Sequence, residues 1–384
     1  MNILILGDAN SIFMKDFCEH VLKKEDNVCI VSYTDTKSSL EFYQKMCIKE
    51  IYIRPYIEDC SIHLDNIISI LIKRKKEIKR VLPFQKIDVI HVHYVEPSVL
   101  LQLFFIWISA KKRILTFWGS DILRISRENK KLLRPFLSMA SSITFMIPAQ
   151  YNAFCDIYGN YYKKVQIVDM GDEIIDIIED VQTKYSRNSC KKCFGMATNK
   201  ITIHVGYNKS KEQQHLKLVE QICLLPRTIS SKIQIVFPWA YGGENTTEED
   251  EYILQLKQLL KQKEIDYMFV NEFLTGEKLA MFRSSCDIFL YAQTTDARSA
   301  STIEYVYAGS LFICPSWVWD NYSIINHVQN ICVRYYDISE VKNILYRNIS
   351  KGDYANSNDN QELRKIIYKN VSWKYLAAQW RNLY

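Results

Sequence analysis

Short apolar runs alternate along the chain with longer segments in which apolar residues recur every three or four positions. The runs contain few polar residues, which is typical of parallel strands covered on both faces. In the first half, strands are expected at residues 2–6, 28–33, 48–53, 88–93, 113–117, 143–147 and 165–168. Helical periodicity between them, as at residues 11–22, 65–80 and 97–110, predicts a doubly wound parallel sheet.

This alternation stops at a polar stretch and then starts again. We interpret residues 176–198 as a linker between a first domain of residues 1–175 and a second of residues 199–360. Strands of the second domain are expected at residues 201–205, 233–237, 267–270, 288–291 and 311–314. The predicted fold class is α/β, with two doubly wound Rossmann-like domains facing a cleft, and ligands are expected beyond the carboxyl ends of the strands.

Composition narrows the class of protein. The 384 residues are 48% hydrophobic, which excludes a mainly disordered chain, and the formal net charge of +6 is too small to argue for nucleic acid. No signal peptide and no transmembrane helix are expected. The 11 cysteines are therefore expected as thiols in a reducing cytoplasm.

One loop-and-helix segment carries the most specific chemistry. Asp296 and Glu304 stand eight apart after an expected strand, and a small-residue helix ending Ala308-Gly309 follows. This segment resembles the retaining GT-B glycosyltransferases of family 4, in which two acidic residues have this spacing. The resemblance implies that Glu304 binds the ribose hydroxyls of a sugar nucleotide and that Asp296, a Glu in the family, lies near the donor sugar.

Neighbouring groups in the same segment would hold the diphosphate. Ser301 and Thr302 offer hydroxyls and backbone amides at the start of a helix, and Arg298 offers a cation. The alternative for Ser301 and Glu304 is a capping box, in which the glutamate side chain accepts from the amide of the N-cap residue.

The turn after the first strand of the second domain is a further candidate. It contains Gly206, Asn208, Lys209, Lys211 and His215, and the loop after the next strand contains Tyr241 and Gly242. Both segments resemble the lipid-linked acetamido-dideoxygalactose (Fuc4NAc) transferases. The resemblance implies that these residues contact the donor diphosphate, although Tyr207 stands where family 4 enzymes have an arginine. Alternatives are a local hydrogen bond for His215 and a solvated helix start for the lysines.

The first domain offers fewer candidates. Asp121 follows Trp118-Gly119-Ser120, which resembles the family's H-G-x-D loop with Trp118 in place of the histidine. Asp121 could orient or deprotonate an acceptor hydroxyl, or could cap the following helix. His91 and His93 are expected to point to opposite faces of a strand, so we predict no joint metal site, and no other metal site is predicted.

Positive charge concentrates in one region. Residues 61–135 hold 15 Lys and Arg against 6 Asp and Glu, and Lys73, Arg74, Lys75 and Lys76 end a helix that carries several isoleucines. Such a helix favours contact with an anionic membrane surface. The alternative is a solvated helix end, where cations complement the macrodipole.

Together these features lead to one functional hypothesis. We expect a metal-independent glycosyltransferase, more retaining than inverting, that transfers a hexosyl-type sugar from a nucleotide diphosphate sugar without any cofactor. The acceptor is expected to be a hydroxyl of a bacterial-type surface glycan such as capsule or O-antigen, lipid-linked, at the cytoplasmic face of the membrane. By the same resemblance, residues 361–384 pack back on the first domain as helices. The alternatives are a GT-B sugar-nucleotide epimerase and a catalytically silent GT-B partner subunit.

Overall fold

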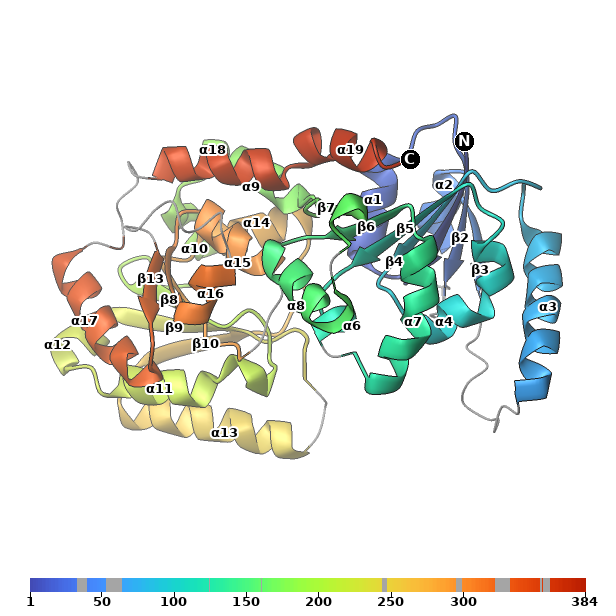
Figure 1. The fold of residues 1–384 in the computed structure, drawn as a ribbon. Coiled ribbons are helices and arrows are strands. Elements are labelled where there is room, and N and C mark those ends of the chain that lie inside the picture. Colours follow the sequence, from blue (N-terminus) through green and yellow to red (C-terminus); the bar gives the residue numbers. More distant parts are fainter. Residues whose placement is uncertain are drawn as a thin grey trace. The chain divides into compact units, whose positions relative to one another are not determined.

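The structure is a computed structural model that divides the chain into two compact units. Unit 1 comprises Met1–Gly171 with Trp373–Tyr384, and unit 2 comprises Asp172–Ser372 (Figure 1). The structure describes residues 1–32, 40–52, 64–123, 125–159, 161–243, 247–294, 299–321, 332–352, 354 and 360–384.

Seven parallel strands form the sheet of unit 1, in the order β3-β2-β1-β4-β5-β6-β7. They are β1 (Asn2–Gly7), β2 (Asn27–Ser32), β3 (Lys49–Tyr52), β4 (Val89–His93), β5 (Lys112–Phe117), β6 (Ser142–Phe145) and β7 (Val165–Ile167). The helices are α1 (Ile12–Val21), α2 (Leu40–Lys45), α3 (Leu64–Val81), α4 (Pro97–Gln102), α5 (Phe104–Trp107), α6 (Ser120–Leu123), α7 (Arg127–Met139), α8 (Pro148–Tyr158) and α19 (Trp373–Arg381). Leu4 and Leu6 of β1 lie in one apolar core and Ile3 and Ile5 in the other, which explains the unbroken apolar runs.

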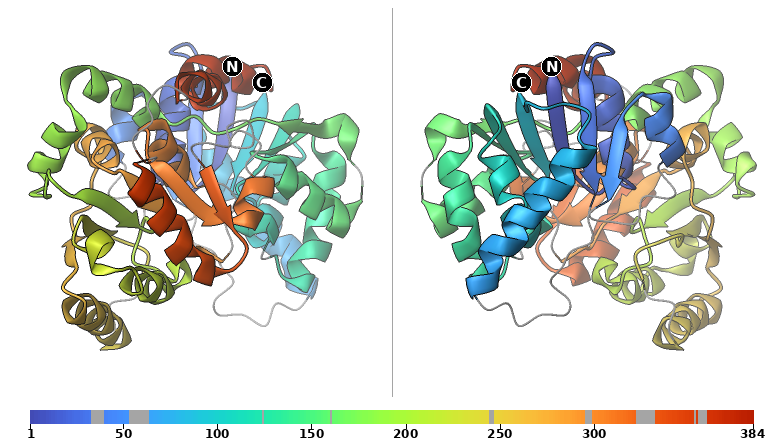
Figure 2. Two further views of the ribbon diagram at one scale, coloured as in Figure 1. Left: turned by 90° about the vertical axis from the view of Figure 1, so that its left-hand side faces the viewer. Right: turned by 90° about the vertical axis from the view of Figure 1, so that its right-hand side faces the viewer.

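Six parallel strands form the sheet of unit 2, in the order β10-β9-β8-β11-β12-β13. They are β8 (Ile201–Val205), β9 (Ile233–Pro238), β10 (Asp266–Val270), β11 (Ile288–Leu290), β12 (Leu311–Pro315) and β13 (Cys332–Tyr335). The helices are α9 (Glu173–Lys184), α10 (Arg187–Cys193), α11 (His215–Cys223), α12 (Arg227–Ser230), α13 (Thr247–Gln262), α14 (Gly276–Ser284), α15 (Ala300–Tyr307), α16 (Ser316–Asn321), α17 (Val341–Lys351) and α18 (Asn360–Val371). The predicted fold class, α/β with two doubly wound parallel sheets, is confirmed; Figure 2 shows each sheet between its helices. Among the described residues, no helix is both long and apolar enough to cross a membrane.

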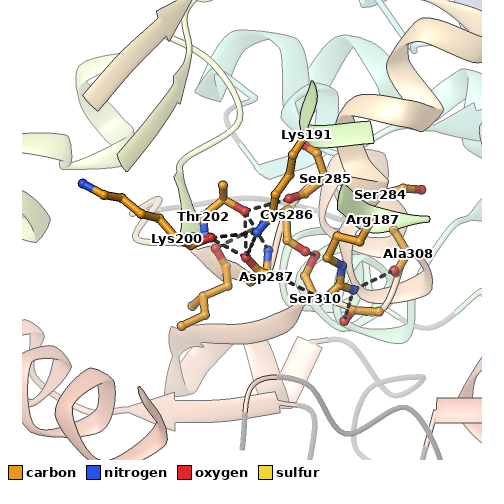
Figure 3. Close-up of polar contacts among 12 residues, drawn as sticks. Arg187, Lys191, Lys200, Thr202, Ser284, Ser285, Cys286, Asp287, Ala308 and Ser310 are labelled. Carbon is orange, nitrogen blue, oxygen red and sulfur yellow. Dashed lines mark hydrogen bonds and ion pairs between the residues drawn. The ribbon is translucent and has the colours of Figure 1, made fainter. Parts of the chain in front are cut away.

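Residues 176–198, for which the sequence predicts a linker, instead form helices of unit 2. Ile175, Ile178 and Val181 of α9 are buried in a core of that unit, because their spacing of three places them on one side of the helix. A polar network anchors α10 beside the strands (Figure 3). In it, Asp287 accepts hydrogen bonds from Lys191 Nζ at 2.5 Å and from the Thr202 backbone N–H at 2.8 Å.

The last helix, α19, belongs to unit 1, whereas α18 belongs to unit 2. The indole N–H of Trp380 donates to the Asp169 carbonyl at 2.8 Å, and Arg381 donates to both carboxylate oxygens of Asp26 at 2.6 and 2.9 Å. Gly171 is required beside this helix, because a Cβ there would lie 2.1 Å from the Trp373 ring. Aromatic burial and a bidentate ion pair thus hold the helix on unit 1.

Four of the histidines that the structure describes are buried: His91, His93, His204 and His215. His91 is hydrogen-bonded to Tyr384 and Thr116, and His204 to Tyr305. Burial lowers the pKa of His91 and of His204 well below its ordinary value and lowers the pKa of His93 and of His215 to about 3. The expectation that His91 and His93 point to opposite faces is wrong: residues two apart in a strand share a face, and the two rings lie 4.0 Å apart.

Because these four histidines are neutral in the folded protein, we predict that its stability depends on pH. Because the unfolded chain protonates them below about pH 6.5, the free energy of unfolding should fall as the pH is lowered from 6.5 towards 4. Each histidine contributes up to about 1.4 kcal/mol per pH unit. Burial raises the pKa of Asp121 to about 6. Between about pH 4 and 6 the folded protein therefore keeps a proton on Asp121 that the unfolded chain has lost, and this offsets the proton of one histidine. Urea unfolding at a series of pH values measures the dependence.

The matched variant is His93→Leu. Neither ring nitrogen of His93 has a hydrogen-bond partner within the described part of the chain, so leucine removes a titrating group without breaking a hydrogen bond. We expect the pH slope of unfolding to decrease by about 1.4 kcal/mol per pH unit. An unchanged slope in this variant would contradict the account.

Candidate functional site

The strand order of unit 2 places several candidate residues at one point of its sheet. β8 pairs with β9 on one side and with β11 on the other, so the connections that leave β8 and β11 diverge between them. Ligands of doubly wound sheets bind at such a switch point, beyond the carboxyl ends of the strands. The loops after β8, β9 and β11 and the start of α15 therefore form the candidate site.

Backbone contacts join these loops into one layer. Gly206 N–H donates to the Leu290 carbonyl at 2.9 Å, and Lys209 N–H donates to the Tyr241 carbonyl at 2.8 Å. Gly206 has φ +66°, and a Cβ there would lie 2.9 Å from His215 Nε2 and 3.1 Å from Gln213 Oε1. Both the left-handed conformation and the close approach require glycine.

The buried His215 points into this layer. Tyr252 Oη accepts from the Leu216 N–H at 3.3 Å, so its own proton is available to His215 Nδ1 at 3.4 Å. The neutral ring then carries its proton on Nε2, which faces Gly206. Burial lowers the pKa of the ring, and a hydrogen bond with the Asn208 backbone raises it by a smaller amount. His215 can therefore donate one hydrogen bond to a ligand without being charged.

The residues predicted to bind the diphosphate differ in their exposure to solvent. Asn208 is buried, and its Oδ1 accepts from the Ser210 N–H at 3.0 Å, which shapes the turn. Lys211 is exposed in a 3-10 turn that precedes α11. Tyr241 is 42% exposed, and its ring contacts Phe273 edge-on with the centroids 5.7 Å apart.

A buried ion pair positions the acidic residue of α15. Glu304 and Arg283 are 5% and 4% exposed, and Arg283 Nε donates to Glu304 Oε2 at 2.6 Å. The guanidinium also lies over the Tyr305 ring, 4.3 Å from its centroid. Burial alone would lower the pKa of Arg283, but the Tyr305 hydroxyl and the Glu304 carboxylate raise it above its ordinary value. Arg283 therefore keeps its charge and fixes the Glu304 carboxylate.

The capping-box alternative for Ser301 and Glu304 is not formed. Helix α15 begins at Ala300 with Ser299 as its N-cap, so Ser301 is already inside the helix. The Ser301 hydroxyl instead accepts from Arg283 Nη2 at 2.8 Å. Thr302 is fully buried, and its Oγ1 has no partner within the described chain. Asp296 and Arg298 lie outside the described residues.

In unit 1, Asp121 connects two loops through hydrogen bonds. Its carboxylate accepts from the backbone N–H groups of Val95 at 2.9 Å, Trp118 at 3.0 Å and Gly119 at 2.8 Å. Burial raises its pKa to about 6, against the effect of these donors, which lower it. Asp121 therefore holds the loop after β4 and the loop after β5 together.

Two polar residues of this layer were not among the predicted site residues. Arg283 lies on α14, twenty-one positions before Glu304, and its charge alone does not distinguish it from a surface arginine. Gln213 is fully buried, and its side-chain amide donates to the Gln293 side chain across the switch point. Only the folded arrangement of β8 and β11 brings these groups together.

Comparison with known proteins adds the family and the fold. Residues 2–150 match the model of a family described as glycosyl transferase 4-like. Curated protein sequences gave no match. Among solved structures, Anabaena HepE in complex with UDP has 12% identity and a TM-score of 0.72, with 100% of this chain and 99% of that chain covered.

Two further structures agree in fold. Sucrose-phosphate synthase from Thermosynechococcus elongatus has 13% identity and a TM-score of 0.70, over 100% of this chain and 98% of that chain. A glycosyltransferase from Rickettsia africae has 15% identity and a TM-score of 0.68, over 100% and 97%. At such identities the likeness establishes the fold. The chain therefore has the GT-B fold of nucleotide-sugar glycosyltransferases, and its N-terminal unit matches the glycosyl transferase 4-like family.

Proposed function

We propose that the protein transfers a sugar from a nucleotide diphosphate sugar to an acceptor hydroxyl and that unit 2 binds the donor. The observation that carries the proposal is the layer at its switch point. There the loop after β8 supplies a left-handed glycine and a neutral histidine donor, and α15, the helix that follows β11, supplies a buried glutamate held by arginine. HepE, which shares the fold, is described in complexes with UDP and UDP-glucose.

In this proposal the residues divide between ribose and diphosphate. Glu304 accepts hydrogen bonds from the ribose hydroxyls through its oxygen that does not contact Arg283. The diphosphate contacts the backbone at Gly206, the Nε2–H of His215, the cations of Lys209 and Lys211, and the first amides of α15. Arg298 is proposed on the diphosphate and Asp296 near the donor sugar, both from the family resemblance alone.

The reaction breaks the bond between the anomeric carbon and the diphosphate oxygen. The nucleoside diphosphate leaves with the electron pair, while the acceptor oxygen bonds to the anomeric carbon and passes its proton to an oxygen of the departing diphosphate. Positive groups and oriented amides stabilise the charge that develops on the diphosphate, so no step of this scheme requires a metal ion. A hexosyl donor and a retained anomeric configuration are proposed from the resemblance to family 4.

The acceptor is assigned to unit 1. We propose that Asp121 is a positioning residue whose hydrogen bonds hold the loops after β4 and β5, rather than a base. The proposed acceptor is a lipid-linked intermediate of a surface glycan such as capsule or O-antigen. A donor of the Fuc4NAc type is proposed on the likeness of the segments around Gly206 and Tyr241.

The first prediction separates diphosphate contacts from nucleoside contacts. His215→Leu removes the Nε2–H donor, and Lys211→Gln removes an exposed cation. Each change should weaken UDP binding by about tenfold or more, because a charge-assisted hydrogen bond contributes about 1.5–3 kcal/mol. Uridine binding should change little. Calorimetric titration with UDP and uridine measures both, with Lys261→Gln as the exposed control. If the binding of UDP and the binding of uridine weaken equally, His215 and Lys211 do not contact the phosphates.

The second prediction uses the ion pair of Glu304. Glu304→Gln should weaken UDP binding about tenfold or more and also destabilise unit 2, because Arg283 is left buried without its carboxylate. Loss of one partner of a buried pair costs about 3–5 kcal/mol. Adding Arg283→Gln removes the uncompensated charge, so the double variant should regain part of that stability without regaining UDP affinity.

Melting temperatures and calorimetric titration on the same samples test this prediction. The ligand role of Glu304 requires that stability and affinity separate in the double variant. If UDP affinity returns together with stability, Glu304 serves only the fold of α15, and the proposed donor site fails.

A further inference from the structure

The outer surface of unit 1 carries a groove that the proposed transfer reaction does not use. It lies between α3 and α5, has a volume of about 610 Å³, and is lined by Ile72, Lys75, Lys76, Lys79, Arg80 and Phe105. In the right-hand view of Figure 2, α3 is the foremost helix of unit 1 and runs across the outside of its strands. We name this feature the α3–α5 groove.

No carboxylate of the described residues pairs with the cations of the α3–α5 groove. Four of its six lining residues are cations, and none of these four forms an ion pair within the described part of the chain. The neighbouring Arg74 differs, because it pairs with Glu77 at 3.2 Å. Lys75 Nζ lies 5.4 Å from the centre of the Phe105 ring, which keeps this ammonium group at the groove. The groove therefore favours a ligand with concentrated negative charge.

Apolar side chains continue the same side of α3. Ile68 and Ile72 are 63% and 42% exposed, and they stand four apart, in line with Lys75 and Lys79. The core does not account for them, because Leu71 and Ile78 are the apolar residues of α3 that are buried among those whose burial the structure describes. Ile108, the residue that follows α5, is 42% exposed. Cations and exposed isoleucines thus share one face.

We propose that the α3–α5 groove binds the phosphate of an anionic phospholipid and that unit 1 thereby docks on an anionic bilayer. The cations contact the headgroup phosphate, and the isoleucines reach the boundary of the acyl chains, as in other basic amphipathic helices. A free phosphate or a nucleic acid would leave the isoleucines without a role. The inference rests on the proposed function in one respect: the lipid-linked acceptor proposed above would lie at the surface of the bilayer.

Flotation with lipid vesicles tests the proposal on the full chain. The wild-type protein should bind vesicles of phosphatidylcholine with phosphatidylglycerol and not vesicles of phosphatidylcholine alone. Binding should weaken between about 0.1 and 1 M salt, because exposed charges are screened. The variant K75Q/K76Q/K79Q/R80Q should lose roughly 600-fold in partitioning, since each cation near an anionic surface strengthens binding about fivefold.

The matched control removes the same charge from unit 2. Lys261, Lys263, Lys365 and Lys369 are exposed, and K261Q/K263Q/K365Q/K369Q should bind vesicles as the wild-type protein does. The variant I68Q/I72Q keeps every cation and should still lose about tenfold in partitioning, because it removes the apolar contact. Equal loss in the control, unchanged binding of I68Q/I72Q, or equal binding of the wild type to neutral vesicles would each overturn the proposal.

UDP titration distinguishes the two sites. K75Q/K76Q/K79Q/R80Q should bind UDP with wild-type affinity, which also shows that the variant is folded. If the wild-type protein binds none of UDP, GDP and dTDP but floats with anionic vesicles, the donor proposal fails and the lipid site stands. If UDP binds and no vesicle does, the lipid site alone is overturned.

Discussion

Parallel pairing around a central first strand is the constraint on which both units depend. In unit 1 the chain starts at β1 and builds the sheet first to one side and then to the other, and unit 2 repeats this from β8. Two connections then leave neighbouring strands in opposite directions, which opens the point where ligands of such sheets bind. The candidate donor residues of unit 2 and the loops that Asp121 joins in unit 1 both lie at this point of their sheet.

The ion pair between Arg283 and Glu304 is better understood as a positioning device than as a source of stability. Burying two charges removes them from water, and their attraction repays that cost only when the geometry is good. Here the guanidinium donates to Glu304 and to Ser301 and lies over Tyr305, so three partners fix it. A carboxylate held in this way keeps its orientation whether or not a ligand is bound, which suits a site for hydroxyl groups.

Features encoded by local pattern could be predicted from the sequence, and features created by the fold could not. Most strands are runs of apolar residues, so the sequence pattern predicts them. It does not predict the edge strand β13, whose Arg334 is exposed. Helix α9 has the composition of a linker because its polar side dominates, although its three buried positions are spaced for one helix face. Glu304 stood out by its spacing from Asp296, but its partner Arg283 lies on another helix, and no local pattern joins them. The role of Asp296 remains a prediction.

Hydrogen–deuterium exchange of the full chain tests the central claim, that the switch point of unit 2 binds the donor. The ligand is whichever of a panel of UDP-, GDP- and dTDP-sugars raises the melting temperature most, since a ligand stabilises the folded state it binds. We predict slower exchange at residues 206–213, 239–243 and 299–304 when this ligand is bound. Binding without protection at these residues, or protection only in the loops of unit 1 that follow β1 and β4, would contradict the account.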